Sequence, residues 1–275
     1  LLWLLDKTET AMGARLLRSW VESPLINRSR IEARLSCVEA LKDDFIRSEE
    51  LSDALQNVAD MERLLGKISY NNLNARDCLA LLRSLRSVGP VKELLSSFDV
   101  LHLNALAHTM TPLDGLCGLI ESAIAPDPPL LISDGGVIAD GYNAELDELN
   151  FEQNDGKGVI TRVETAEKER TGIKKLKVGY NRVFGYYIDI PKSAGLENVP
   201  EDYIRKQTLV SNERYFTAEL KELESDLINA RERINELEYR YFCQVRDSVA
   251  SKVDRIQAAA EAVAKLDVLC SLAEV

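Results

Sequence analysis

The chain has 275 residues, of which 45% are apolar, and its formal net charge is −11. This length fits one large domain or two smaller ones, and the absence of a run of about 18 apolar residues excludes a membrane-spanning helix. The acidic balance argues against a protein that binds nucleic acid over its whole surface.

Residues 1–5 are apolar, but the stretch is too short for the hydrophobic region of a signal peptide and no basic segment precedes it. Because the chain begins in mid-pattern without a Met, we expect it to be a fragment of a longer protein. The cysteines show no CxxC spacing, which indicates a reducing compartment and neither a disulfide framework nor a zinc site. They are Cys37, Cys78, Cys117, Cys243 and Cys270.

Residues 1–141 are predicted to form a helical core. Apolar side chains recur every three or four residues, as between Leu16 and Trp20, and few β-branched residues alternate with polar ones. Proline is expected to break the helical pattern at Pro24, at Pro90 and in the stretch 126–129.

Residues 142–170 are predicted to form one long helix. Its less polar positions are spaced alternately by three and four residues, which is the pattern of a coiled-coil seam. Gly156 and Gly158 weaken its middle, because a glycine in a helix costs about 1 kcal/mol relative to alanine. We therefore expect a kink or local disorder there. The seam positions are Leu146, Leu149, Gln153, Gly156, Ile160, Val163 and Glu167.

Residues 171–216 change to the period of two that is typical of β-strands. Thr171 and Gly172 should end the preceding helix, and residues 181–182 should turn a hairpin between two strands rich in aromatic and β-branched side chains. Two shorter strands, at 206–210 and 214–216, should flank a turn at Ser211 and Asn212. The segment is therefore predicted to form a small antiparallel sheet of about four strands.

Residues 217–275 are predicted to return as helix. Thr217 is a suitable N-cap, with Glu219 and Glu222 near the positive helix end. Two long helices with a sheet between them predict an antiparallel coiled-coil arm, and the alternative is a pair of ordinary amphipathic helices in a compact bundle. The seam of this second helix is Leu220, Leu223, Leu227, Ala230, Ile234, Leu237 and Tyr241.

Basic residues collect in the predicted sheet. Residues 173–216 contain eight Lys and Arg against five Asp and Glu, a local charge of +3 that leaves −14 for the rest of the chain. Since salt screens charges beyond roughly 8 Å, a basic patch can act on an acidic protein. Lysine and arginine neutralise phosphates, and Asn and Ser in turns donate hydrogen bonds to them. The candidate DNA-backbone-binding residues are Lys174, Lys175, Asn181, Arg182, Lys192, Ser193, Lys206, Ser211 and Asn212.

Explanations that involve no DNA binding are also open. The charge asymmetry could be a solvated surface, and Phe184, Tyr186 and Tyr187 fit the core of a small sheet better than a platform for stacking bases. The sequence contains no GxxxxGK[ST] loop, HExxH motif or Cys/His cluster. The two histidines, His102 and His108, lie in a leucine-rich helical stretch. We therefore expect no enzymatic activity, cofactor or metal in this chain.

Several stretches, in order along the chain, resemble the MutS family of DNA mismatch repair proteins. They are similar to the start of its core, to the entry of its lever helix, to its clamp and to the end of its lever, and together they extend over essentially the whole chain. The stretches are LLDKTETAMGARLL at 4–17, DGGVI at 134–138, GYNAELD at 141–147, ERTGIK at 169–174, KVGYNRVFGYYI at 177–188, RKQTL at 205–209, ERY at 213–215 and LDVL at 266–269.

The resemblance implies a mainly α fold: a multi-helix core with long antiparallel lever helices that carry a small antiparallel β-sheet clamp at the tip. It implies that the clamp binds the backbone of double-stranded DNA without reading sequence, and that the levers relay between DNA and an ATPase domain. The implied divisions are a core at 1–141, an outgoing lever at 142–170, a clamp at 171–216, and a returning lever with the close of the core at 217–275.

The resemblance also implies properties of a longer parent protein. These are a homodimer, a mismatch-repair partner such as MutL, and DNA-dependent ATPase activity that uses ATP and Mg in a domain outside this chain. The implied location is the bacterial cytoplasm, in association with the nucleoid. A coiled-coil structural scaffold, or a MutS relative that acts in recombination, is the alternative.

Two positions depart from the family pattern. The Asn that contacts phosphate in the family's turn falls on Ser211, with Asn212 one position later, so either residue is a candidate donor. Gly156 and Gly158 interrupt what is usually a continuous lever helix.

Overall fold

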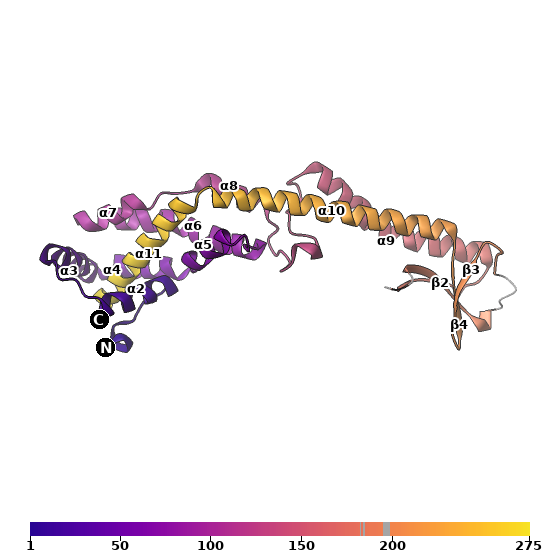
Figure 1. Cartoon of the computed structure of the whole chain (residues 1–275), viewed down its shortest axis with the longest axis horizontal. Helices are drawn as coiled ribbons and strands as arrows, with labels where there is room; N and C mark the ends of the chain where they lie inside the picture. Colours follow the sequence, from indigo (N-terminus) through magenta and orange to yellow (C-terminus); the bar gives the residue numbers. More distant parts are fainter. Residues whose placement is uncertain (182, 184, 195–198) are drawn as a thin grey trace. The chain divides into compact units, whose positions relative to one another are not determined.

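The computed structural model describes residues 1–181, 183, 185–194 and 199–275, with the backbone alone at residue 152 and residues 154–157. The chain divides into two compact units. Unit 1 contains Leu1–Ala139 and Tyr239–Val275, and unit 2 contains Asp140–Glu238. Figure 1 labels the elements in chain order.

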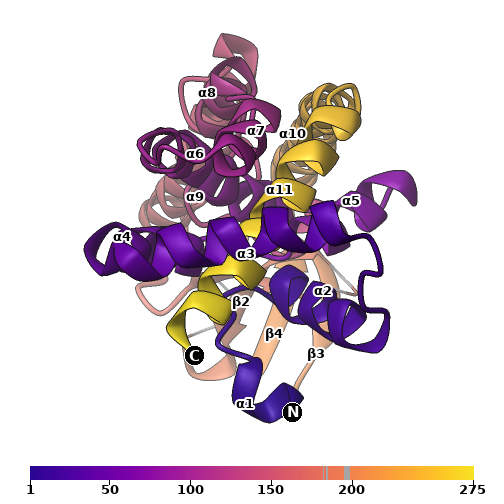
Figure 2. The ribbon, with the colours of Figure 1, turned by 90° about the vertical axis from the view of Figure 1, so that its left-hand side faces the viewer.

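Unit 1 is built of helices that gather around the last one. Helix α11 is buried along most of its length and packs against α2, α3, α4, α5 and α7 (Figure 2). Small side chains such as Ala259, Ala260 and Ala264 let these neighbours approach closely. The helices are α1 (Leu2–Leu5), α2 (Ala11–Glu22), α3 (Arg28–Asp43), α4 (Phe45–Gln56), α5 (Met61–Ser69), α6 (Ala75–Ser96), α7 (Leu101–Thr109), α8 (Asp114–Ala123), η1 (Ile132–Asp134) and α11 (Val253–Glu274).

Asp267 of α11 holds the start of α2. Its side chain is buried, and its carboxylate accepts hydrogen bonds from the N–H groups of Glu9 (2.9 Å) and Thr10 (2.8 Å) and from the Thr10 hydroxyl (2.6 Å). Burial raises the pKa of Asp267, and these three donors oppose that rise. One helical turn later, the Ser271 hydroxyl accepts a hydrogen bond from the Lys7 N–H at 2.8 Å. Side chains of α11 therefore fasten the segment that leads into α2.

Pro90 does not end a helix, and that prediction is wrong. It lies inside α6, which continues to Ser96. The preceding residue is Gly89, which has no Cβ to clash with the proline ring. Val88 and Val91 on either side are fully buried, so packing of this face offsets the hydrogen bond that proline cannot donate.

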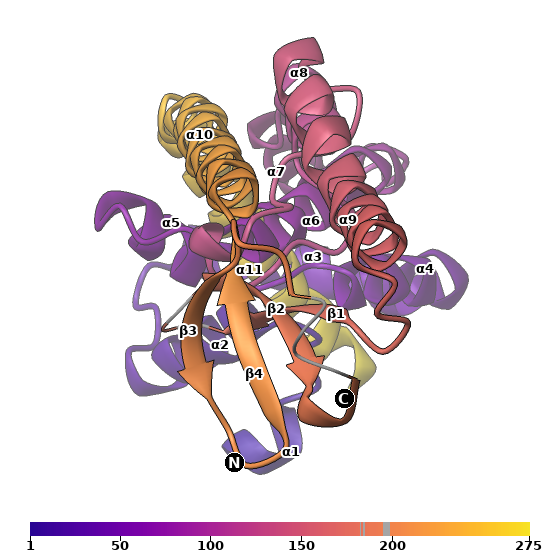
Figure 3. The same ribbon diagram turned by 90° about the vertical axis from the view of Figure 1, so that its right-hand side faces the viewer.

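Unit 2 contains a four-stranded antiparallel sheet, as predicted, in the order β1-β2-β4-β3 (Figure 3). The second hairpin differs in detail from the prediction. Strand β3 begins at Ile204, and Asn212 is the first residue of β4, where it pairs with Pro191 instead of lying in the turn. The elements are α9 (Ala144–Thr171), β1 (Lys177–Asn181), β2 (Gly185–Pro191), η2 (Lys192–Ala194), β3 (Ile204–Thr208), β4 (Asn212–Phe216) and α10 (Ala218–Ala250), of which α10 contributes residues to both units.

The predicted seam of α10 and the described positions of the α9 seam lie on the less exposed sides of these helices. On α10, Leu220, Ile234 and Leu237 are buried and the other four seam positions are half-buried. The two helices run in opposite directions (Figure 1), and Arg233 of α10 pairs with Glu145 of α9 at 2.7 Å. Thr217 is confirmed as the α10 N-cap, since its hydroxyl accepts the Leu220 N–H at 3.1 Å.

Helix α9 runs without a break from Ala144 to Thr171, so Gly156 and Gly158 do not end it, and the kink or local disorder expected there stays a prediction. Its ends are well defined. The Asn143 side chain accepts the Leu146 N–H, and Gly172 ends the helix in the left-handed conformation at φ 70°. Secure ends and a packed seam offset the cost of two glycines. Among the described helices of both units, none is both long and apolar enough to cross a membrane.

We predict that Gly13→Ala destabilises the chain by about 1–3 kcal/mol, as overpacking of a core does. A Cβ at Gly13 would lie 2.1 Å from Oδ2 of Asp267. The matched control is Gly66→Ala on the exposed side of α5, where an added Cβ meets no atom within 4 Å. That control should stabilise the chain by about 0.5–1 kcal/mol. Chemical denaturation compares the free energies of unfolding of the two variants. Equal values would contradict the close packing of Asp267 against α2.

Candidate nucleic-acid interface

A hydrophobic cluster fixes the sheet to the helices of unit 2. Ile188 and Ile190 of β2 are fully buried on the inner face, because successive side chains of a strand alternate between faces. Ile160 and Val163 of α9 pack against this cluster, and Leu220 of α10 is part of it. The inner face is therefore used for packing. The remaining members are Ile173, Leu176, Tyr203 and Tyr215, with Val178, Tyr186, Ala194 and Val199 at its margin.

Two tyrosine hydroxyls donate hydrogen bonds to carboxylates at the edge of this cluster. Tyr215 donates a hydrogen bond to Glu213, and Tyr203 donates one to Glu167, each at 2.5 Å. Burial, followed by the adjacent carboxylate, raises the pKa of Tyr215 to about 12 and also raises the pKa of Tyr203. Both hydroxyls therefore remain donors at neutral pH, which keeps Glu213 and Glu167 engaged inside the unit.

The outer face carries a polar network of Tyr187, Asp189, Gln207, Asn212 and Arg214. The Arg214 guanidinium lies 4.3 Å from the centre of the Tyr187 ring and donates a hydrogen bond to Gln207 at 3.0 Å. It also pairs with Asp189 at 3.5 Å, and the Asn212 amide donates a hydrogen bond to the same carboxylate. This outer-face network joins three adjacent strands, β2, β4 and β3.

Four predicted residues meet at one end of the sheet. Lys192 and Ser193 follow β2, Ser211 lies in the β3–β4 turn, and Asn212 begins β4. The Lys192 N–H donates to the Ser211 carbonyl at 2.9 Å, which ties the two segments together. Lys192, Ser193 and Ser211 are exposed, whereas Asn212 is half-buried and its amide is bound to Asp189. Ser211 is therefore the more accessible donor of the two candidates in this turn.

The other predicted residues do not share this end. Lys174 and Lys175 are exposed in the loop between α9 and β1, and Lys206 is exposed on β3 at a break in its register with β4. The Asn181 side chain accepts the Val183 N–H at 2.8 Å, which confirms a turn at the opposite end of the β1–β2 hairpin. Arg182 and the aromatic candidate Phe184 lie outside the described residues.

The carboxylates of this region that form ion pairs do so with arginines, so its lysines remain available to bind phosphate. Asp202 pairs with Arg170, Asp189 with Arg214, and Glu213 with Arg205. Among the residues that the structure describes, no carboxylate pairs with the lysines of this region. These are Lys174, Lys175, Lys177, Lys192 and Lys206.

Sequence reasoning missed Lys221 and the outer-face network. Lys221 lies in the first turn of α10, and its ammonium is 4.3 Å from the centre of the Phe216 ring, with Lys206 at 5.0 Å from the same ring. Its position four residues after the predicted N-cap of an acidic helix gave no sign of this neighbour. The basic surface therefore extends from the sheet onto the helix that follows it.

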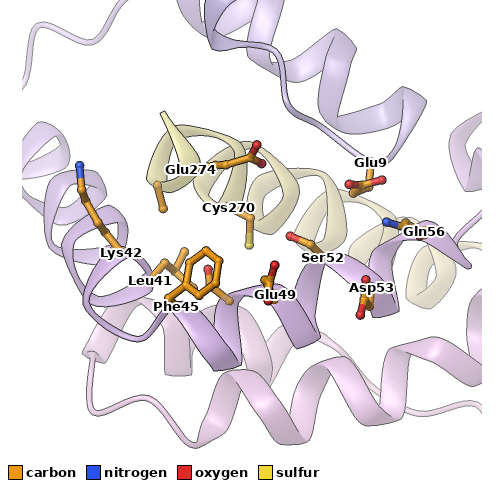
Figure 4. A pocket seen from close by; sticks show the side chains of 12 residues that line it. Glu9, Leu41, Lys42, Phe45, Glu49, Ser52, Asp53, Gln56, Cys270 and Glu274 are labelled. Carbon is orange, nitrogen blue, oxygen red and sulfur yellow. The ribbon is translucent and has the colours of Figure 1, made fainter.

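Unit 1 has a surface pocket of about 540 Å³. It lies between the end of α3, helix α4 and the last turns of α11, and none of the predicted site residues lines it (Figure 4). Carboxylates outnumber lysines in its lining, so it repels phosphate and does not belong to a backbone-binding surface. The charged lining residues are Glu9, Lys42, Glu49, Asp53 and Glu274.

Comparison with known proteins places the whole chain in one family. Residues 1–273 match the family model for MutS domain III. Proteins described as "DNA mismatch repair protein MutS" from Ruminiclostridium cellulolyticum and Alkaliphilus oremlandii are each 47% identical, over 275 and 274 residues, and one from Lachnoclostridium phytofermentans is 49% identical over 276 residues. Each match covers 100% of this chain but only 31%, 31% and 29% of these relatives.

Glu164 of α9 covers the free edge of β1. Its carboxylate accepts the Val178 N–H at 2.9 Å and pairs with Lys168 at 2.5 Å. The Lys168 contact, and then the Val178 hydrogen bond, lower the pKa of Glu164 below its usual 4.5. A carboxyl group whose pKa is lower in the folded state adds stability above its usual pKa, and that stability is lost as pH falls through the folded value.

We therefore predict that acid weakens the attachment of β1. Glu164→Gln keeps an acceptor for Val178 but removes the titrating charge, so it should be less stable than the wild type at neutral pH and lose less stability on acidification. Free energies of unfolding at about pH 7 and about pH 3 test this. An unchanged pH dependence in the variant would contradict it.

Proposed function

The chain belongs to the MutS family of DNA mismatch repair proteins, and we propose that the sheet of unit 2 grips the phosphate backbone of duplex DNA. The observation that carries the proposal is the partition of charge: the two carboxylates on the strands, Asp189 and Glu213, are held by internal partners, whereas the lysines of the sheet and its loops are exposed. Such cations bind DNA phosphates and release the counterions condensed on them, and this contribution does not depend on the DNA sequence.

The interface supports positioning on DNA and not the reading of bases. Lysine ammonium groups and the Ser193 and Ser211 hydroxyls suit phosphate oxygens, which carry no sequence information. The half-buried Tyr187 stacks against Arg214 of its own sheet, and Tyr186 packs toward the hydrophobic cluster. These two aromatic side chains are therefore engaged within the protein.

The finer role that we propose is a clamp on DNA joined to levers that relay the DNA-bound state. Helix α10 supports a relay, since this single helix contributes residues to both units. The relatives named "DNA mismatch repair protein MutS" favour repair over recombination as the process. For the parent protein we propose homodimerisation, a mismatch-repair partner such as MutL, and an ATPase domain outside this chain that uses ATP and Mg.

Duplex binding that weakens steeply with salt is the expected behaviour of the chain. We expect a dissociation constant on the order of 10⁻⁴ to 10⁻⁶ M that is the same for matched and mismatched duplexes. Reversing Lys174 and Lys175 to Glu should abolish measurable binding. The matched control reverses Lys42 and Lys252, two exposed lysines of unit 1, and changes net charge equally.

Fluorescence anisotropy between about 50 and 200 mM salt measures these affinities. Equal loss of binding in both double variants would show that net charge alone governs the interaction, and would contradict a localised interface. Binding that did not depend on salt would contradict backbone contacts.

We also propose that the chain itself is not an enzyme. Among the described residues, no group of three His, Cys, Asp or Glu side chains is arranged to hold a metal ion. A steady-state assay of phosphate release, with ATP, Mg and duplex DNA present, should show no hydrolysis above background. An ATPase activity that copurified with the chain and disappeared when the chain was unfolded would contradict this proposal.

A further inference from the structure

We propose that Asp189 is a positioning residue for DNA binding, which holds the β3–β4 turn so that Ser211 meets a phosphate. This inference rests on the proposed function, because it assigns a role within the same interface. A search for DNA-binding residues by charge would not identify Asp189, since a carboxylate repels phosphate.

Asp189 holds β4 by two side chains. The Asn212 amide donates a hydrogen bond to its carboxylate, and the Arg214 guanidinium pairs with it at 3.5 Å. Only 22% of the Asp189 side chain is exposed, and its Oδ1 atom is buried and faces Arg214 as an ion pair without a hydrogen bond. The charge is therefore turned toward the protein, where Arg214 balances it.

Two backbone hydrogen bonds also hold the turn that contains Ser211. The Leu209 N–H donates to the Asn212 carbonyl at 2.8 Å, and the Lys192 N–H donates to the Ser211 carbonyl at 2.9 Å. Asn212 is thus held through its backbone by Leu209 and through its side chain by Asp189. Ser211 itself is exposed, so these bonds set its position while leaving its hydroxyl open to a ligand.

Two roles for Asp189 predict opposite effects of its removal. As a mere negative charge near the interface, its loss would reduce repulsion and tighten binding to DNA. As the group that holds the turn, its loss would release the Asn212 amide and weaken binding, although the chain gains one unit of positive charge. The sign of the effect therefore distinguishes the two roles.

The test compares duplex binding by the full chain as wild type, Asp189→Ala and Glu201→Ala, by anisotropy at several salt concentrations. Glu201 is an exposed acid of the same unit, so its removal changes net charge equally. We expect Asp189→Ala to bind roughly fivefold to tenfold more weakly, the size of a coupling between neighbouring groups. Its salt dependence should match the wild type, because a serine contact releases no counterion. Glu201→Ala should bind equally well or more tightly.

Two further variants separate positioning from a general loss of folding. Asp189→Asn keeps an oxygen that accepts the Asn212 amide, and should retain most of the affinity. In a Ser211→Ala background, Asp189→Ala should lower the affinity for DNA little further, because both changes remove the same contact. Tighter or unchanged binding by Asp189→Ala, or a loss that adds in full to that of Ser211→Ala, overturns the inference and leaves the proposed DNA binding intact. Failure of the wild type to bind duplex at low salt overturns both.

Discussion

The sheet of unit 2 depends on the hydrophobic cluster that it shares with two helices. The four strands are five to seven residues long, and their buried inner face packs against helices of the same unit. Ile160 and Val163 of α9, with Leu220 of α10, close the inner face over Ile188. Because packing occupies that face, only the outer face, the strand ends and the adjoining loops remain for a ligand.

The same constraint decides which charges reach solvent. A carboxylate near the sheet's core must find a donor, and Glu213 does so in Tyr215, as Glu167 does in Tyr203. Lysine has a long flexible stem and can keep its ammonium in water. Packing therefore holds these carboxylates inside the unit, while the lysines of the sheet stay exposed.

Sequence periodicity could predict the elements because each depends on local pattern. The four strands, the Thr217 cap and the α10 seam are all confirmed. What failed depends on contacts between distant residues. Pro90 is tolerated because its helix face is buried, and Asn212 is engaged because the register places it beside Asp189. No pattern along the chain reports which side chains a strand register brings together.

The acidic remainder of the chain restricts where DNA can bind and does not argue against binding. Residues outside 173–216 carry a net charge of −14, and the charged side chains that line the 540 Å³ pocket of unit 1 are mostly carboxylates. Phosphate is repelled there, whereas the sheet attracts it over distances of roughly 8 Å at physiological salt. A uniformly basic chain would bind duplex in many orientations. A basic surface confined to one part of an acidic chain allows fewer of them.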